Sequence, residues 1–251
     1  MGAHGEKLNM LAVLQHYDAL INQKHLARAG AFLTDSLDKA RQIGDKAAEL
    51  TLLNELVGYH RRSGDREAAL TACDDALRLL KELPLENTAA EGDTCLNCAT
   101  TRSIYGEDAL PLYKQARHAY LHAVPADDFK WAGFYNNYGL TLAKAGRTGE
   151  ALTCYEKALR VLKGRDEYLH DAAVTYCSIA EVHLDRGDAD KATACLDAAW
   201  QRLESPANIR NGAYAFSCEK CVGAFERGGQ TERAAALSDR AKEIYERHRT
   251  E

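Results

Sequence analysis

Between residues 135 and 159 the chain reads YNNYGLTLAKAGRTGEALTCYEKAL. The middle of this stretch is a glycine-containing turn followed by an alanine, and similar segments occur at four other places in the sequence. They read RSGDREAAL at 62–70, RGDADKA at 186–192 and GGQTERA at 228–234, with a weaker copy, EDAL, at 107–110. Successive copies lie 40, 42, 41 and 42 residues apart, counted between the closing alanines Ala69, Ala109, Ala151, Ala192 and Ala234. A fixed period of this size predicts a stack of one small repeated structure.

Residues 46–81 indicate what one repeat contains. Apolar residues recur at helical spacing on both sides of a break at Ser63-Gly64-Asp65. Gly64 suits the left-handed conformation that ends a helix, and Asp65 is a good cap for the helix that follows. One repeat is therefore expected to be two antiparallel helices joined by a tight turn, with small residues such as Ala69 and Ala76 allowing close approach.

Composition excludes several classes of protein. The 251 residues are 46 % apolar and 27 % charged, which suits a globular protein, and the formal net charge of −5 gives no case for a nucleic-acid partner. No apolar run approaches the roughly 20 residues that span a bilayer. The first residues also lack the unbroken apolar segment of a signal peptide. We therefore expect a cytoplasmic protein without membrane contact.

The repeated pattern resembles the tetratricopeptide repeat. The best match to the family signature is carried by Tyr135, Tyr138, Gly139, Gly146, Ala151, Tyr155 and Ala158. The resemblance implies an all-α fold, a right-handed superhelical solenoid of about six antiparallel helix pairs. The period of 40–42 residues exceeds the 34 of the usual repeat, so the chain is similar to the long-helix variety found in kinesin light chains and some bacterial regulators.

On this basis we expect one solenoid over residues 1–251. Its parts are an atypical helix pair at 1–45, repeats at 46–86, 127–168 and 169–208, and a C-terminal repeat at 209–251. An irregular repeat at 87–126 completes the spacing. Its first helix carries polar Asn97 and Thr100 where apolar residues are expected, and Pro111 should lie in the first turn of its second helix.

Eight cysteines include two Cys-x-x-Cys pairs, Cys95/Cys98 and Cys218/Cys221. The pairs are three repeats apart, whereas a zinc site usually separates its pairs by about 15 to 20 residues. We therefore favour packing for these cysteines, with a redox role as the alternative and zinc as the least favoured. No motif for catalysis or phosphate binding is found, so we expect no enzyme activity, metal or cofactor.

In tetratricopeptide repeat proteins the first helix of each repeat lines a groove, and this resemblance gives the candidate binding residues. In each repeat the register at i, i+4 and i+7, with the residue that follows, should face the groove. The candidates are Asn54, Gly58, Arg61, Arg62, Thr94, Cys98, Thr101, Arg102, Asn136, Leu140, Lys144, Cys177 and Glu181.

Two features of these candidates suggest a ligand. Asn54 and Asn136 each carry a donor and an acceptor, which suit the backbone of an extended peptide. Basic candidates precede acidic residues along the chain, from Arg61 to Glu181, so the groove should favour a segment with one acidic and one basic end. The alternative is that these are ordinary solvated residues on a polar face.

The sequence thus predicts a non-catalytic scaffold that binds a peptide or protein segment in its groove. The alternative is a peptide-responsive sensor or regulator that acts on a separate output partner. The sequence leaves open the identity of the partner, homo-oligomerisation, and whether the groove or the opposite face binds.

Overall fold

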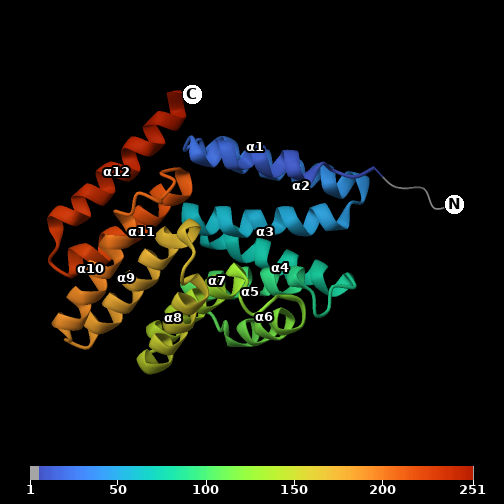
Figure 1. Cartoon of the computed structure of the whole chain (residues 1–251). Helices are drawn as coiled ribbons and strands as arrows, with labels where there is room; N and C mark the ends of the chain where they lie inside the picture. Colours follow the sequence, from blue (N-terminus) through green and yellow to red (C-terminus); the bar gives the residue numbers. More distant parts are fainter. Residues whose placement is uncertain (1–5, 251) are drawn as a thin grey trace. The chain divides into compact units, whose positions relative to one another are not determined.

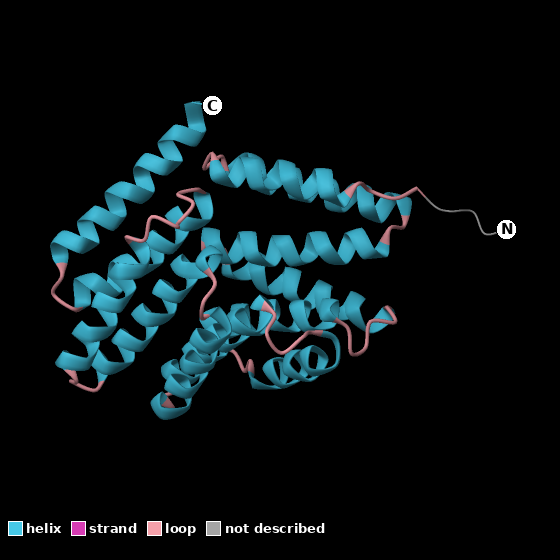
Figure 2. Ribbon diagram, viewed as in Figure 1, coloured by secondary structure: helices cyan, strands magenta, loops and turns pink. Residues whose placement is uncertain are grey.

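Helices account for about four fifths of the residues that the computed structural model describes, 6–250. Twelve α-helices and no β-strand are found in this range (Figure 1, Figure 2). Consecutive helices pack on one another in antiparallel pairs, which confirms the all-α fold of about six helix pairs. Residues 1–5, part of the expected atypical helix pair and of the segment searched for a signal peptide, lie outside this range, as does Glu251.

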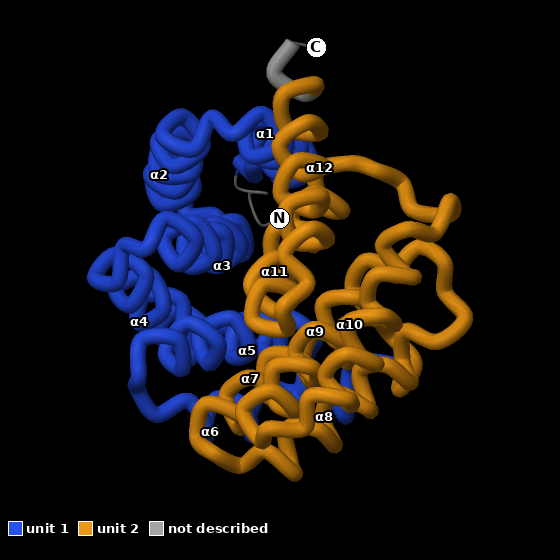
Figure 3. Tube along the Cα trace, turned by 90° about the vertical axis from the view of Figure 1, so that its left-hand side faces the viewer, with its two compact units in different colours: residues 1–125 blue, residues 126–251 orange. Residues whose placement is uncertain are grey.

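The chain divides into two compact units, Met1–Pro125 and Ala126–Glu251 (Figure 3). Unit 1 holds α1 (Met10–Asn22), α2 (Leu26–Ile43), α3 (Lys46–Ser63), α4 (Arg66–Glu82), α5 (Ala89–Ile104) and α6 (Leu110–Ala123). Unit 2 holds α7 (Phe129–Lys144), α8 (Thr148–Leu162), the short 3₁₀ helix η1 (Asp166–Tyr168), α9 (Leu169–Asp185), α10 (Ala189–Leu203), α11 (Gly212–Arg227) and α12 (Thr231–Thr250). A single solenoid over the whole chain stays a prediction.

The turn between α3 and α4 has the expected chemistry. Gly64 has φ of 78°, in the left-handed region where a side chain would be strained. The Asp65 carboxylate accepts a hydrogen bond from the backbone N–H of Ala68 at 3.1 Å, which caps α4. The turn residues therefore end one helix and begin the next, and both predictions are confirmed.

Small residues set how closely the helices of a pair approach. In α7 and α8, a Cβ added at Gly139 would lie 2.7 Å from Cε1 of Tyr155, whose ring is almost fully buried. Ala151 and Ala158 flank that ring on α8 and are also fully buried. The glycine and the alanines of the repeated pattern thus make room for a tyrosine in the interior.

Most of the cysteines lie in the interior. All eight lie within the described range, all are free thiols, and Cys195 alone among them is not buried. Cys218 and Cys221 belong to the apolar core of unit 2, between α9, α10, α11 and α12. Over the described part of the chain, no three metal-ligating side chains gather into a group, and no helix is long and apolar enough to cross a membrane.

Candidate functional site

The predicted residues of unit 1 form a polar contact between α3 and α5. Nδ2 of Asn54 donates to Oγ1 of Thr94 at 2.9 Å, and Nη1 of Arg61 donates to Oγ1 of Thr101 at 2.7 Å. Asn97 joins the two contacts, because its Nδ2 donates to the carbonyl of Asn54 at 2.8 Å and its Oδ1 accepts from Arg61 at 2.7 Å. This row of hydrogen bonds links neighbouring repeats and explains the polar Asn97 of the irregular repeat.

Three of these predicted residues have no exposed surface. Thr94, Cys98 and Thr101 are all fully buried, so their side chains pack between helices in this structure. Burial lowers the pKa of the Arg61 guanidinium, and no carboxylate in the described range forms an ion pair with it. Arg61 is therefore held by neutral acceptors inside unit 1.

The remaining predicted residues of unit 1 lie nearer to solvent. Arg62 is exposed, and a Cβ added at Gly58 would lie 3.9 Å from Nη2 of Arg61, an ordinary van der Waals contact. Arg102 pairs with Asp74 on α4 at 2.7 Å, so its charge is already compensated within the unit.

Unit 2 carries a hollow on the face made by its first helices, α7, α9 and α11. This hollow, here called the α7–α9–α11 pocket, has a volume of about 430 Å³. Three of the predicted residues line it: Asn136, Leu140 and Glu181. Phe129, Ala132, Gly133, Asn137, His170, Asp171, Val174, Ser178, Ala213, Phe216, Ser217 and Lys220 complete the lining. The fold therefore brings part of the predicted register together in unit 2.

Asn136 presents one half of its amide to this pocket. Its Oδ1 accepts from Oγ1 of Thr175 on α9 at 3.1 Å, and the same hydroxyl donates to the carbonyl of Asp171 at 3.0 Å, so a shared hydrogen bond holds the group in place. The hydrogen bond with Thr175 is the one that this side chain makes with residues of the described range, and it leaves Nδ2 uncommitted. A fixed amide with an uncommitted N–H donor can recognise a carbonyl oxygen of a ligand.

Two carboxylates border the pocket on α9. Burial raises the pKa of Asp171, while the nearby His170 and Lys220 act in the opposite direction. Burial also raises the pKa of Glu181, which Arg227 of α11 approaches to 3.9 Å. Neither carboxylate accepts a side-chain hydrogen bond from the described residues, so both keep acceptor capacity for a ligand.

On α7 and α9 the lining of the pocket begins about one helical turn or more before the first residue of the predicted register. On α9 the pocket uses Asp171, Val174, Ser178 and Glu181, whereas the register began at Cys177, which is buried. On α7 the lining runs from Phe129 to Leu140 and does not include the exposed Lys144. The spacing of Asp171, Val174, Ser178 and Glu181 at i, i+3, i+7 and i+10 was the sequence signal for this face.

A serine, a histidine and an aspartate meet at the pocket, but not as a catalytic triad. Nδ1 of His170 lies 3.0 Å from Oγ of Ser217 and 3.6 Å from Oδ2 of Asp171. A triad needs the serine and the carboxylate on opposite nitrogens of the ring, so that the base is oriented while it takes the proton. Here the Ser217 hydroxyl and the Asp171 carboxylate both lie near Nδ1 of His170, and Ser217 is buried. The arrangement fits structural support of the pocket wall.

Comparison with known sequences finds the same repeat. Residues 132–205 match the family model described as tetratricopeptide repeat. Photosystem I assembly protein Ycf3 of Prochlorococcus marinus (strain MIT 9303) is 31 % identical over 122 residues, which are 48 % of this chain and 63 % of that protein. The chain therefore covers less than two thirds of the length of this relative.

Two solved structures share the fold. BtubC (BKLC) from P. vanneervenii is 19 % identical, with a TM-score of 0.60 over 88 % of this chain and 91 % of that chain. A putative kinesin light chain from Podosopora anserina, with nearly identical TPR-like repeats, is 13 % identical, with a TM-score of 0.55 over 80 % and 97 %. At these identities the likeness concerns the fold alone.

Proposed function

We propose that this chain, whose residues 132–205 match the tetratricopeptide repeat, is a non-catalytic scaffold that holds an extended segment of a partner protein in the α7–α9–α11 pocket. Proteins of this fold act in protein–protein interaction. The proposal adds where the partner binds, in the α7–α9–α11 pocket, and what binds there, an extended protein segment. An extended segment exposes unpaired backbone groups, which polar side chains of a receptor can satisfy.

The observation that carries this proposal is the fixed amide of Asn136 within a mixed polar and apolar hollow. The N–H of Asn136 can donate to a peptide carbonyl, while Glu181 and Asp171 can accept from peptide N–H groups or from a cationic side chain. Leu140, Val174 and Phe216 offer apolar contact for alternate side chains of the segment. Pockets of a few hundred Å³ with a small number of placed polar groups are typical ligand sites.

Paired variants of two asparagines test this proposal. Peptides that bind the wild-type chain are first selected from a random library, and their Kd is then measured on each variant. Asn136→Ala should raise the Kd by about tenfold, which corresponds to the loss of one well-placed hydrogen bond. Asn54→Ala is the matched control, because the Asn54 amide is already bonded to Thr94 in unit 1. Equal Kd values for wild type and Asn136→Ala would refute the site.

The name of one relative suggests in which process such a scaffold acts. A protein 31 % identical over 122 residues is named as an assembly protein, and we propose that the bound segment belongs to a subunit of a protein complex under assembly. In a strain without this chain, native electrophoresis should show one complex lost while its subunits persist uncomplexed. An unchanged profile of complexes would contradict the assembly role and leave the peptide site to its own test.

A further inference from the structure

Another short sequence pattern occurs twice in the chain, each time in the second helix of a repeat. Residues 76–81 read ALRLLK and residues 158–163 read ALRVLK, at the ends of α4 and α8. Each unit therefore carries one copy. Within each copy the first leucine is half-buried and the arginine and final lysine are exposed.

Each copy borders a groove between second helices. In unit 2, the α8–α10 groove has a volume of about 320 Å³ and is lined by Leu159, Arg160, Leu162, Lys163, Gly164, Arg165, Asp166, Leu169, Ala172, Tyr176 and Arg202. In unit 1, the α4–α6 groove has a volume of about 640 Å³ and is lined by Asp74, Leu77, Arg78, Leu80, Lys81, Leu83, Leu85, Glu86, Glu91, Arg102, Leu112 and Gln115. The repeated leucine, arginine and lysine thus line both grooves.

The α8–α10 groove carries an excess of positive charge. Four cations line it against one carboxylate, that of Asp166. Arg160 and Lys163 have no ion-pair partner among residues 6–250, and Arg165 pairs at 3.6 Å only with Asp127, which is 85 % exposed. The carbonyl end of α8 offsets about half of one charge, so a net positive field remains over the groove.

One of these cations is held in place. The guanidinium of Arg202 stacks over the ring of Tyr176 at 4.2 Å, and its Nη1 donates to the carbonyl of Ala198 at 2.8 Å. Leu159, Leu169 and Tyr176 supply the apolar floor beside it. A fixed arginine beside an apolar floor loses little side-chain entropy when a carboxylate binds.

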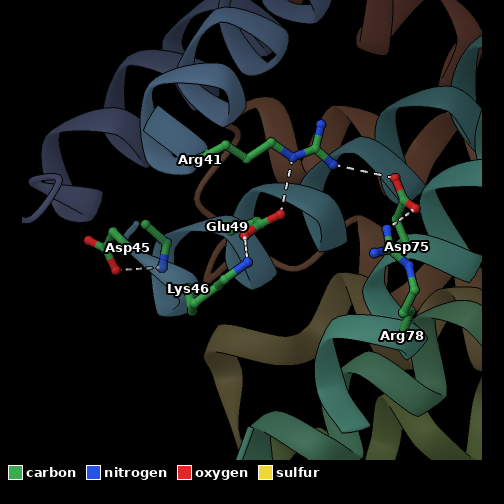
Figure 4. Close-up of polar contacts among 7 residues, drawn as sticks. Arg41, Asp45, Lys46, Glu49, Asp75 and Arg78 are labelled. Atoms are coloured by element: carbon green, nitrogen blue, oxygen red, sulfur yellow. Dashed lines mark hydrogen bonds and ion pairs between the residues drawn. The ribbon is translucent and has the colours of Figure 1, made fainter. Parts of the chain in front are cut away.

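The α4–α6 groove has the same repeated residues, but its charges are compensated. Arg78 pairs with Asp75 at 2.7 Å, as Figure 4 shows, and Arg102 pairs with Asp74 at 2.7 Å. Glu86 and Glu91 add further carboxylates to the lining. The chain therefore contains an internal control in which the shared residues lack the excess charge.

From these observations we propose that the α8–α10 groove is a second binding site, for an acidic protein segment that places an apolar side chain between carboxylates. Oppositely charged surfaces speed encounter and reject partners of the wrong charge. The floor of Leu159, Leu169 and Tyr176 suits an apolar side chain of a peptide, which a nucleic-acid backbone does not offer. This site is separate from the α7–α9–α11 pocket, and neither proposal depends on the other.

Two labelled peptides and two double variants test the proposal by fluorescence anisotropy. The first peptide has a leucine flanked by glutamates, and its twin has glutamine at each glutamate. The full chain should bind the acidic peptide at least about tenfold more tightly than the twin, and added salt should weaken that binding, because solvent-exposed ion pairs are screened. Arg160→Ala with Lys163→Ala should remove the preference, whereas Arg78→Ala with Lys81→Ala should leave it within about twofold.

The outcomes separate the proposal from its rivals. Failure of the acidic peptide to bind, equal binding of both peptides, or an equal loss in both double variants would overturn it. Tighter binding of a single-stranded oligonucleotide than of the acidic peptide would also overturn it, since the groove would then serve a different class of partner. Circular dichroism of both double variants should match the wild type, because all four substituted side chains are exposed.

Discussion

Asn54 and Thr94 lie 40 residues apart, one repeat period, and their side chains are joined by a hydrogen bond of 2.9 Å from Nδ2 to Oγ1. Thr94 in turn donates to the carbonyl of Ala90 at 2.9 Å and is fully buried. The sequence pattern assigned Asn54 to ligand binding, but its amide donor connects α3 to α5. The period of the chain is thus visible as a side-chain contact between equivalent faces of adjacent repeats.

Replacing Thr94 by valine should therefore destabilise the protein. The change keeps the shape and leaves one N–H of the half-buried Asn54 amide without its acceptor, while the bond from the same nitrogen to the carbonyl of Leu50 remains, at a cost of about 1–3 kcal/mol in the free energy of unfolding. Thr51→Val is the control, because the Thr51 hydroxyl donates only to a carbonyl of its own helix. Urea unfolding followed by far-UV circular dichroism measures both, and equal stabilities of the two variants would contradict the role of the contact.

Two glycines of α7 should respond in opposite ways to alanine. Gly139→Ala places a methyl group 2.7 Å from the buried Tyr155 ring, and overpacking of this kind costs about 1–3 kcal/mol. Gly133 has no atom within 4 Å of an added Cβ, so Gly133→Ala should raise stability by up to about 1 kcal/mol through helix propensity. Thermal unfolding distinguishes the two, and a stabilising Gly139→Ala would refute the close packing of this pair.

Glu49 makes part of the stability dependent on pH. Figure 4 shows its carboxylate between Arg41, at 3.1 Å, and Lys46, at 3.0 Å. Burial acts to raise the pKa of Glu49, but the hydrogen bonds from Lys46 and Arg41 outweigh it and leave the pKa lowered. A lowered folded-state pKa adds stability above the unfolded value of about 4.3, and this stability is lost as the pH falls through the folded value.

Glu49→Gln should therefore lower the free energy of unfolding at neutral pH by about 1–3 kcal/mol, with the difference shrinking below about pH 4. Glu67→Gln, an exposed carboxylate at the first turn of α4, should change stability far less. Urea titrations over a pH series measure both variants. A Glu49 effect that is constant with pH would contradict the assignment.

Thiol labelling tests the packing role of the cysteines. Burial raises the pKa of Cys95 to about 12 and that of Cys218 to about 11, and both side chains are fully buried. At about pH 8, iodoacetamide should modify Cys195 first, because thiolates react and this thiol has the most exposure of the eight. Mass spectrometry of digested samples identifies the labelled sites. Early labelling of Cys95 or Cys218 in the folded protein would favour a reactive role instead.

The sequence predicted the fold well because the fold follows local rules. A glycine that ends a helix, an aspartate that caps the next, and Pro111 in the first turn of α6 are each visible in a few adjacent residues. The packing of Gly139 against Tyr155 could be inferred from the repeated pattern, since both positions belong to it.

The binding face was harder to predict because it depends on which side of each helix stays exposed. Cys177 and Thr94 occupy the expected register but are turned into the interior, whereas Asp171 and Ser178 line the pocket from neighbouring positions. Side chains three or four residues apart share a helix face, so a small error in register replaces lining residues with core residues. Hydrogen bonds between helices, such as that from Asn54 to Thr94, cannot be predicted from the sequence pattern of a single helix.

The most direct test of the central claim is hydrogen–deuterium exchange of the full chain with and without a peptide selected from a random library. Peptide binding should slow backbone exchange in residues 129–140, 170–181 and 213–220, the segments of α7, α9 and α11 that line the pocket. Leu140→Glu, which introduces a charge into that lining, should abolish both the binding and the slowing. Slowed exchange confined to segments outside these three, with Leu140→Glu binding the peptide as well as the wild type, would contradict the account.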